Sequence, residues 1–323
     1  MSQETPNRLH ITEDDSGKRL DNLLFRYARY WPRDYVYRLI RSGQVRLDKK
    51  RAKPSTKVRA GQSLRVPPGF FTPAKAPVVI PPAMVAKIGA SIAYSDANLV
   101  LINKPPGMAA HAGSRHAYGA VELLRAWFTE HEPRISTHFP ELVHRLDRLT
   151  SGCLLLAKNI ATLHQLQQLW RHRQVSKTYT ALVHKHVSTE QKVDLPLAVQ
   201  QQSNKRVVVD HKAGKQACTS IVPQQRLWLA GTPVTLVNCQ PEGGRMHQIR
   251  VHCQSIGHPI VGDPLYQNRL QHQWSEKVLG ECLLLHATRL QFNWHNEEYV
   301  FYLPGEERLI AATSKQQQSK SVE

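Results

Sequence analysis

A proline-rich stretch, PPGFFTPAKAPVVIPP at residues 67–82, is the feature that most limits how this chain can fold. It holds six prolines in sixteen residues, and each proline fixes its own φ and lacks the amide donor that helices and sheets use. Such a segment is extended. We therefore predict a first folded unit at residues 1–66, a linker at 67–85 and a second folded unit at 86–310. The polar sequence at the end predicts a disordered tail at 311–323.

The chain carries a strong excess of positive charge. Of its 323 residues, 43 are Lys or Arg and 25 are Asp or Glu, which gives a net charge of +18. The first 66 residues hold sixteen of the basic residues and seven of the acidic ones, so half of the excess lies in a fifth of the chain. Such an excess attracts polyanions, and nucleic acid is the commonest partner. A merely solvated basic surface is the alternative that charge alone leaves open.

The first unit has the pattern of two short helices and a hairpin. In residues 19–30 the apolar positions recur at the spacing of an amphipathic helix, and residues 33–43 repeat it before Gly43, a common stop signal. Alternation in residues 44–53 and 60–66 predicts two strands around a basic turn. Polar positions of this unit carry the candidate nucleic-acid-binding residues Arg38, Arg41, Lys49, Lys50 and Arg51.

The second unit mixes strand and helix patterns. Apolar or alternating runs predict strands at NLVLIN, GCLLLAK, KTYTALVH, VTLVNC and EEYVFYL. Ile160, Leu163, Leu166 and Leu169 recur at helical spacing in one amphipathic helix. Because helices do not alternate strictly with strands, the pattern favours an α+β fold with a mixed or antiparallel sheet over a doubly wound one.

The stretch HRLDRLTSG at residues 144–152 sets one acid, Asp147, between Arg145 and Arg148. A Thr-Ser-Gly turn closes it, and a strand of buried character follows, so Asp147 is expected on a loop that is partly desolvated yet reachable. An unpaired buried carboxylate is costly, and nearby arginines would keep it ionised. A structural ion pair beside a turn is the other interpretation of this stretch.

Two further stretches carry candidate functional residues. In the strand SKTYTALV, Lys177 and Tyr179 point to the same face, where a Tyr beside a Lys could stack on a base, although a tyrosine at the edge of a core would show the same pattern. In GRMHQIRVHCQSIGHPIVGD, Met246, Ile249, Cys253 and Ile256 form an apolar stripe at helical spacing. Arg250 flanks that stripe and favours a carboxylate partner, for which Asp147 is the candidate. His247 and His252 suit packing and RNA contacts equally.

Five scattered cysteines, at 153, 218, 239, 253 and 282, suggest reduced thiols in a cytoplasmic protein. We expect no metal, because a set such as Cys239, His247, His252 and Cys253 matches no usual ligand spacing. No apolar run approaches the roughly 18 residues of a membrane span, so no membrane association is expected.

Taken together, these motifs resemble those of the bacterial-type pseudouridine synthases, the family that includes ribosomal large subunit synthases A, C and D. The family signature is an H-R-L-D-x-x-T-S-G loop, a later K-x-Y strand and an R-x-H-Q-I-R helix, and all three occur here in that order. The first unit resembles an S4-type RNA-binding domain. The resemblance covers about residues 15 to 305 and implies a mainly antiparallel catalytic sheet preceded by a small α/β S4-like domain.

The resemblance implies a role for each candidate residue. Asp147 would be the essential carboxylate, acting as a nucleophile or as a base on the ribose, and Arg250 would pair with it. Tyr179 would stack on the target base and help to remove the C5 proton. Arg145 would fill the space that the flipped uracil leaves, while Lys177 and His247 would contact RNA. The isomerisation involves no redox change, so no cofactor is expected.

This chain departs from the family pattern at two positions. Leu149 stands where the family often has an acid, and Met246 stands where it usually has Thr. Neither change touches the Asp, Tyr or Arg of the motifs, although both could alter target choice.

The expected partner is RNA, above all 23S ribosomal RNA or a large-subunit precursor, with transfer RNA and small-subunit RNA as alternatives. A monomer is expected. A non-catalytic RNA-binding or ribosome-assembly protein is a second class, which the intact Asp147, Tyr179 and Arg250 disfavour. A glycoside hydrolase is a third, but that chemistry uses two carboxylates, and Asp147 is the only acid after Glu141 in its motif.

Overall fold

The chain divides into two compact units, Met1–Val79 and Ile80–Glu323. The computed structural model describes residues 7–28, 31, 33–70, 80–113, 117–135, 139–200, 206–305 and 309. The predicted tail and residues 71–79 of the predicted linker lie outside the described residues. Among the described residues, no helix combines the length and the apolar character needed to cross a membrane.

The first unit packs two helices against a small antiparallel sheet with the strand order β1-β3-β2. Its elements are β1 (Arg8–His10), η1 (Glu13–Asp15), α1 (Leu20–Tyr27), α2 (Arg33–Ser42), β2 (Arg46–Leu47) and β3 (Ser63–Arg65). The two predicted helices are confirmed: Leu20, Leu23 and Leu24 of α1 are buried, and α2 ends before Gly43, whose φ is 74°. The apolar face of each helix therefore faces the core of this unit, as helical periodicity requires.

The polar side of this unit is basic. The five predicted cations, Arg38, Arg41, Lys49, Lys50 and Arg51, are all exposed. Lys49 follows Asp48 in the turn after β2, and both residues have positive φ. The Asp48 carboxylate accepts a hydrogen bond from the backbone N–H of Ser63 (2.9 Å), which ties this basic turn to β3.

The second unit is built on one mixed sheet with the strand order β4-β5-β7-β14-β8-β13-β12-β9, with β15 paired to β14 and β6 to β7. Among the described strands only β7 and β14 pair in parallel, so the prediction of a mainly antiparallel α+β sheet is confirmed. Its elements are α3 (Pro82–Gly89), β4 (Ile92–Ser95), β5 (Leu99–Lys104), α4 (Ala120–His131), β6 (Glu141–Leu142), β7 (Ser151–Ala157), α5 (Ile160–Arg171), β8 (Val175–His184), β9 (Gln191–Asp194), β10 (Leu197–Val199), β11 (Val207–Val209), β12 (Cys218–Leu229), β13 (Thr232–Pro241), α6 (Gln248–Ser255), α7 (Arg269–Leu279), β14 (Leu285–Trp294) and β15 (Glu297–Tyr302).

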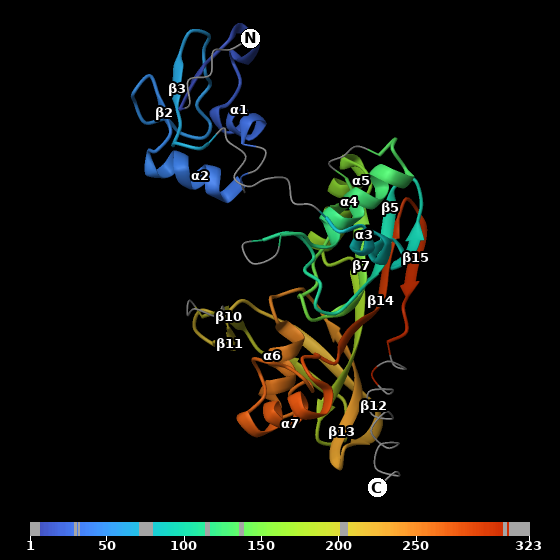
Figure 1. The fold of residues 1–323 in the computed structure, drawn as a ribbon. Coiled ribbons are helices and arrows are strands. Elements are labelled where there is room, and N and C mark those ends of the chain that lie inside the picture. Colours follow the sequence, from blue (N-terminus) through green and yellow to red (C-terminus); the bar gives the residue numbers. More distant parts are fainter. Residues whose placement is uncertain are drawn as a thin grey trace. The chain divides into compact units, whose positions relative to one another are not determined.

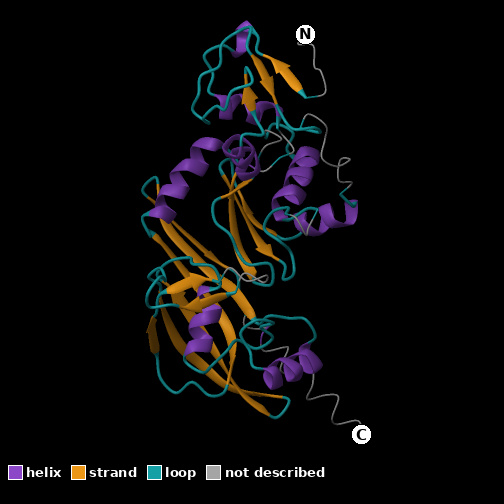
Figure 2. Cartoon of the chain, turned by 90° about the vertical axis from the view of Figure 1, so that its left-hand side faces the viewer, coloured by secondary structure: helices purple, strands orange, loops and turns teal. Residues whose placement is uncertain are grey.

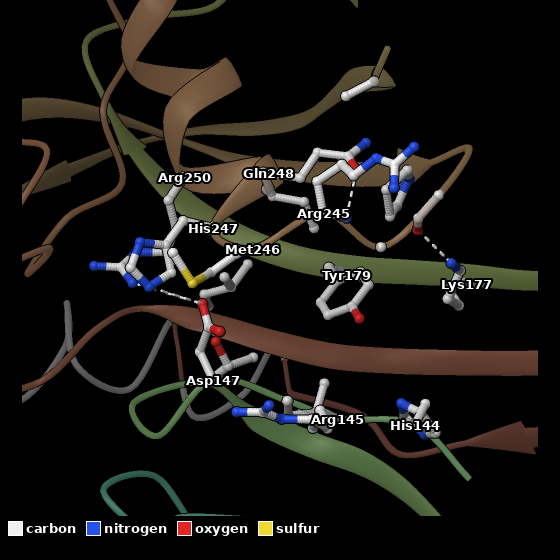
Figure 3. Close-up of a pocket in the computed structure, with 18 of the residues that line it drawn as sticks. His144, Arg145, Asp147, Lys177, Tyr179, Arg245, Met246, His247, Gln248 and Arg250 are labelled. Carbon is white, nitrogen blue, oxygen red and sulfur yellow. Dashed lines mark hydrogen bonds and ion pairs between the residues drawn. The ribbon is translucent and has the colours of Figure 1, made fainter. Parts of the chain in front are cut away.

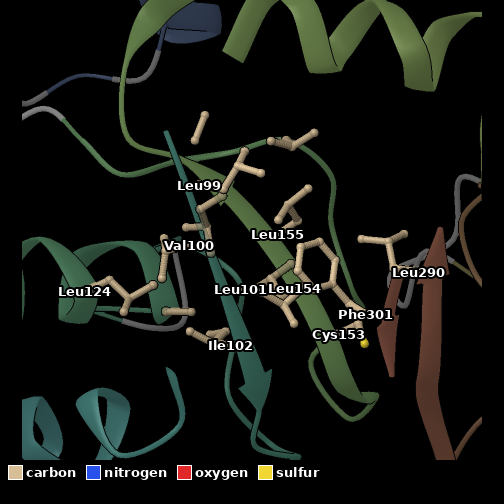
Figure 4. Close-up of a cluster of buried hydrophobic side chains, with 14 of the residues drawn as sticks. Leu99, Val100, Leu101, Ile102, Leu124, Cys153, Leu154, Leu155, Leu290 and Phe301 are labelled. Atoms are coloured by element: carbon tan, nitrogen blue, oxygen red, sulfur yellow. The ribbon is translucent and has the colours of Figure 1, made fainter. Parts of the chain in front are cut away.

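Helices cover the two halves of this sheet separately. Figure 1 shows α3, α4 and α5 around β5 and β7, and α6 and α7 beside β12 and β13; the sheet runs through both halves in Figure 2. Every residue of β7 is buried, and its Leu154 and Leu155 pack with Leu99, Leu101 and Leu124 in the core drawn in Figure 4. A strand buried on both faces has a continuous apolar run, which is the pattern that the sequence shows here.

Two sequence expectations differ from the structure. Helix α3 begins at Pro82, inside the range predicted as linker; proline suits the first turn of a helix, where its missing N–H would have no acceptor. The predicted stripe on α5 holds at Leu166, which is fully buried, but Ile160 at the helix start is 53% exposed. Ile160 is the first residue of α5, and a side chain at a helix end can lie beyond the surface that the rest of the helix covers. Helical spacing alone therefore did not predict its exposure.

Candidate active site

A cleft of about 1940 Å³ in the second unit brings together the three stretches that the sequence singled out. Its lining includes the loop at residues 143–150, Lys177 and Tyr179 of β8, and residues 241–250. Figure 3 shows Asp147 on one side, Arg250 and His247 close to its carboxylate, and Tyr179 across the cavity. These residues lie far apart in the sequence, and the sheet order brings them together.

Close contacts fix the loop that carries Asp147. Gly152, at the start of β7, pairs with Ala287 of β14, and a Cβ at this position would lie 2.2 Å from the Ala287 carbonyl oxygen. Only glycine allows this approach, at a φ of 104°. The Thr150 N–H donates to the Asp147 carbonyl (3.1 Å), and the buried Lys104 ammonium donates to the Arg148 carbonyl (3.1 Å). The loop is thus held from both sides.

Two basic groups face the same oxygen of Asp147. Nη1 of Arg250 lies 3.5 Å from Oδ2, and Nε2 of His247 lies 3.7 Å from it. The expected pairing of Arg250 with Asp147 is therefore present. The Asp147 side chain remains 33% exposed, whereas that of Arg250 is 5% exposed. The acid is consequently held from the protein side and open to the cleft.

The sequence interpretation missed the main partner of Arg250. Asp263, which is fully buried, accepts from Nε (2.7 Å) and Nη2 (2.8 Å) of Arg250 in a two-pronged ion pair. Burial alone would lower the pKa of Arg250, but the Asp263 hydrogen bonds and charge outweigh it and raise that pKa. Asp263 ends the apolar stretch GHPIVGD, and an acid at the end of a buried segment is the signal that could have revealed it.

Tyr179 and Lys177 lie on β8 beside the loop. Burial, together with the charge of Asp147, raises the pKa of Tyr179, so its phenol stays protonated at neutral pH. The Lys177 ammonium donates to the Gly243 carbonyl, and burial and the nearby Arg173 lower the pKa of Lys177 to about 8. Lys177 is therefore held against the turn after β13 and supports the wall of the cleft.

The first two residues of the H-R-L-D motif, His144 and Arg145, lie in different environments. His144 stacks on Trp170 (centroids 5.0 Å apart), and its Nε2 accepts from the Leu155 N–H (3.1 Å). Burial and the charge of Lys177 lower the pKa of His144 to about 3, so this imidazole is neutral and structural. Arg145, in contrast, is exposed at the edge of the cleft. Its guanidinium is therefore accessible to a ligand in the cleft.

Helix α6 begins later than the apolar stripe predicted. His247 has a φ of 55° and precedes the helix, which starts at Gln248. A left-handed residue cannot continue a right-handed helix, so Met246 does not belong to the stripe and is 37% exposed in the cleft. Leu149, the other departure from the family pattern, packs against the apolar cluster that contains Ile249 and Cys253.

The cleft has a basic lining. Its cationic or imidazole side chains are His111, His144, Arg145, Arg148, Arg171, Arg173, Lys177, Lys192, Arg245, His247 and Arg250. Asp147, Asp194 and Glu242 are the acids that line it. In the described parts of the chain no three His, Cys, Asp or Glu side chains cluster as metal ligands would. A strongly basic cleft suits a polyanionic substrate.

A mixed sheet that carries one arginine-held carboxylate in a basic cleft, together with a small basic domain, is the arrangement of an enzyme that acts on nucleic acid. Residues 98–255 match the family model described as RNA pseudouridylate synthase, and residues 18–64 match the S4 domain. The chain is 40% identical over 299 residues to ribosomal large subunit pseudouridine synthase C of Escherichia coli strain K12, which covers 90% of this chain and 91% of that protein. It belongs to the RNA pseudouridylate synthase family and carries an S4 domain.

Further relatives agree. Ribosomal large subunit pseudouridine synthase C of Vibrio cholerae is 38% identical over 317 residues, 96% of this chain and 97% of that protein. The solved structure of human RNA pseudouridylate synthase domain containing 4 superposes with a TM-score of 0.58 at 26% identity, covering 73% of this chain and 96% of that one. Human RNA pseudouridylate synthase domain containing 1 gives 0.57 at 25% identity, with 69% and 86% covered. The protein is thus an RNA pseudouridine synthase.

Proposed function

We propose that this enzyme converts specific uridines of large-subunit ribosomal RNA, or of its precursor, to pseudouridine, with Asp147 as the essential carboxylate. One observation carries the assignment of Asp147. Both basic contacts reach Oδ2 (3.5 and 3.7 Å), while the side chain stays partly open to the cleft. An ionised carboxylate that keeps one oxygen for the substrate meets the need of this reaction.

The reaction exchanges one bond of the ribose for another. The uridine N1–C1′ bond breaks, the uracil turns, and a C5–C1′ bond forms, while C5 loses a proton and N1 gains one. Asp147 can attack C1′ as a nucleophile or act as a base on the ribose; both routes need it charged and exposed on one oxygen. Arg250 is fixed by Asp263 (2.7 and 2.8 Å), which keeps its positive charge 3.5 Å from Oδ2 of Asp147.

Tyr179 and Arg145 serve the base in this proposal. Tyr179 lies across the cleft from Asp147 (Figure 3). Its raised pKa keeps the phenol protonated, so its ring suits stacking on the uracil better than its oxygen suits proton abstraction. A base in folded RNA must leave its stack, at a cost of a few kcal/mol. Arg145 directly follows His144 in the loop and is exposed. Its planar guanidinium can therefore stack in the space that the uracil vacates.

The remaining candidates serve RNA binding. His247 and Lys177 line the cleft, but each is already engaged by the protein, so we assign them to shaping the wall beside the RNA. Arg38, Arg41 and the basic turn at 49–51 of the S4 domain are exposed and would hold phosphates. Backbone contacts of this kind position the RNA without reading its sequence.

The choice of substrate rests on the relatives, because the two described above are named ribosomal large subunit pseudouridine synthase C. The net charge of +18 supports a large polyanion of this kind. We propose that the enzyme acts as a monomer in the cytoplasm, where such RNA is assembled into ribosomes.

Tritium release from RNA labelled at uridine C5 tests this function directly. Wild type and Asp147→Asn are compared on large-subunit RNA from a strain lacking the modification, on transfer RNA, and on pre-ribosomal particles. We expect release by wild type alone, on large-subunit RNA or its particles. Release on transfer RNA alone would make transfer RNA the substrate. Equal release by wild type and Asp147→Asn would show that the carboxylate is not essential. The activity would be rejected if wild type released no tritium from any of these RNAs.

A further inference from the structure

Tyr266 is a buried residue next to the active site, where it contacts both Arg250 and His247. It is 2% exposed and follows Asp263 in the turn after α6, where the Asp263 carboxylate accepts from its backbone N–H (3.2 Å). The guanidinium of Arg250 lies over its ring, 5.0 Å from the centroid, and that of Arg206 lies 5.6 Å away. The two guanidinium groups pack on the ring and hold it in place. The ring in turn sets the position of the Tyr266 hydroxyl.

The hydroxyl of Tyr266 has two neighbours at hydrogen-bonding distance. The backbone N–H of Val207, at the start of β11, donates to it (3.0 Å), and Nδ1 of His247 lies 2.7 Å from it. Since a backbone N–H can only donate, one lone pair of the phenol oxygen is used by Val207. The phenol proton then has His247 Nδ1 as its acceptor among these two neighbours.

This direction decides which nitrogen of His247 carries its proton. When Nδ1 accepts from Tyr266, the neutral imidazole keeps its hydrogen on Nε2. Nε2 is the atom that lies 3.7 Å from Oδ2 of Asp147. The opposite tautomer would instead set a nitrogen lone pair against a carboxylate oxygen, and these two would repel each other.

Burial and the charge of Arg250 lower the pKa of His247, so the ring is neutral at neutral pH and the tautomer is the relevant property. Burial also raises the pKa of Tyr266, which keeps its hydroxyl as a donor. The chain of contacts then runs from the β11 backbone through Tyr266 and His247 to Asp147.

We propose that Tyr266 is a positioning residue that fixes His247 as the Nε2–H tautomer and so aims a second N–H donor, beside Arg250, at Oδ2 of Asp147. This inference rests on the proposed role of Asp147. Both donors then occupy Oδ2, and Oδ1 is the oxygen left for the ribose. Contacts in a free enzyme are often long and tighten when substrate binds, so the 3.7 Å separation closes into a hydrogen bond as RNA enters.

Tyr266→Phe removes the hydroxyl and keeps the ring beneath the two guanidinium groups. We expect kcat for tritium release to fall about 10- to 100-fold, less than the loss of a whole oxyanion donor, with KM for RNA within about twofold. Tyr299→Phe is the matched control, because Tyr299 lies on β15 and its hydroxyl meets only Glu297 among the described residues (3.4 Å). A change in KM alone, or an unchanged kcat, would reject the positioning role.

The tautomer itself is read by nitrogen-15 NMR of histidine-labelled protein, with the His247 signals assigned by their loss in His247→Asn. The wild type should show Nε2 protonated and Nδ1 bare, and Tyr266→Phe should shift this towards Nδ1–H. A protonated Nδ1 in the wild type would overturn the proposal, even if Tyr266→Phe fails to fold. This measurement needs no turnover, so it separates a failure of this inference from a failure of the proposed function.

Discussion

Asp15 in the S4 domain and Asp263 in the catalytic unit are both buried carboxylates, with exposed fractions of 2% and 0%. Asp15 is held by Lys18 (2.8 Å) and Arg26 (3.0 Å), whose side chains are 41% and 57% exposed. Asp263 is held by Arg250, whose side chain is 5% exposed. The two acids therefore share their burial and differ in the solvation of their partners.

This difference shows how one residue type serves two purposes. The exposed cations of the S4 domain pay little for meeting an acid or a phosphate, and salt screens both contacts. Arg250 is almost cut off from water, so salt screens its contact with the fully buried Asp263 much less than it screens the exposed cations. Because their solvation differs, the buried pair and the exposed cations should respond differently to substitution and to salt.

The largest effect is expected from Asp263→Asn. It leaves the Arg250 guanidinium buried without its closest carboxylate, which costs about 3–5 kcal/mol of unfolding free energy, and turnover should fall with it. Urea unfolding and tritium release measure both. Glu276→Gln makes the same acid-to-amide change at an exposed position of α7. It should leave both the unfolding free energy and turnover unchanged. If the Asp263→Asn protein were as stable as wild type, the buried pair of Asp263 would contribute no more than the solvated pairs of Asp15, and the difference between these two acids would be refuted.

Arg145→Ala should come next. If Arg145 replaces the flipped uracil, its loss should slow turnover on folded RNA by roughly a hundredfold, since unstacking costs a few kcal/mol, and much less on a target uridine that is already unstacked. Arg148→Ala is the matched control, because Arg148 is an exposed arginine of the same loop. Equal losses on both RNAs would refute the flipping role of Arg145.

A smaller effect is expected in the S4 domain when Lys49, Lys50 and Arg51 are all changed to Gln. Each phosphate contact that is lost should lower the slope of log affinity against log salt concentration by roughly 0.7 to 0.9, with kcat unchanged. Filter binding from low to high salt measures this slope. The triple change Arg226→Gln, Arg269→Gln and Lys277→Gln alters charge equally at exposed positions of the other unit; the same slope in both variants would sink the assignment.

The smallest effect is expected from Asp15→Asn. Burial alone would raise the pKa of Asp15, but the hydrogen bond from Lys18 and the charges of Lys18 and Arg26 outweigh it, and the pKa is lowered. The carboxylate therefore contributes stability above its unfolded pKa near 3.8, and this is lost as pH falls through the folded value.

Hydrogen exchange of the α1 amides at pH 7 should show Asp15→Asn less stable by about 1 kcal/mol. The gap between variant and wild type should narrow on acidification and in high salt. A gap that grows towards acid would contradict the sign of this pKa shift.

Local patterns predicted both helices and the paired strands β2 and β3 of the first unit, because each helix buries one face against a small sheet close by in sequence. Strand β1 (Arg8–His10) was not predicted. The motifs that resemble the family also led to residues of the cleft, because Asp147, Lys177 with Tyr179, and Arg250 all line it. The start of α6 was not, because a positive φ at His247 is set by contacts outside the helix. Pro82 was assigned to the linker for a different reason: residue type alone does not show which proline of a proline-rich stretch begins a helix.

The sequence by itself determined the class of enzyme, the mainly antiparallel catalytic unit, and the acid, the tyrosine and the arginine of the cleft. Only the tertiary structure decided how these groups are held. Asp263 and Tyr266 follow Arg250 by more than three helical turns of sequence, and no periodicity links them to Asp147. They reach the site because the chain turns back after α6, and a buried charge must find its partner wherever the fold places one.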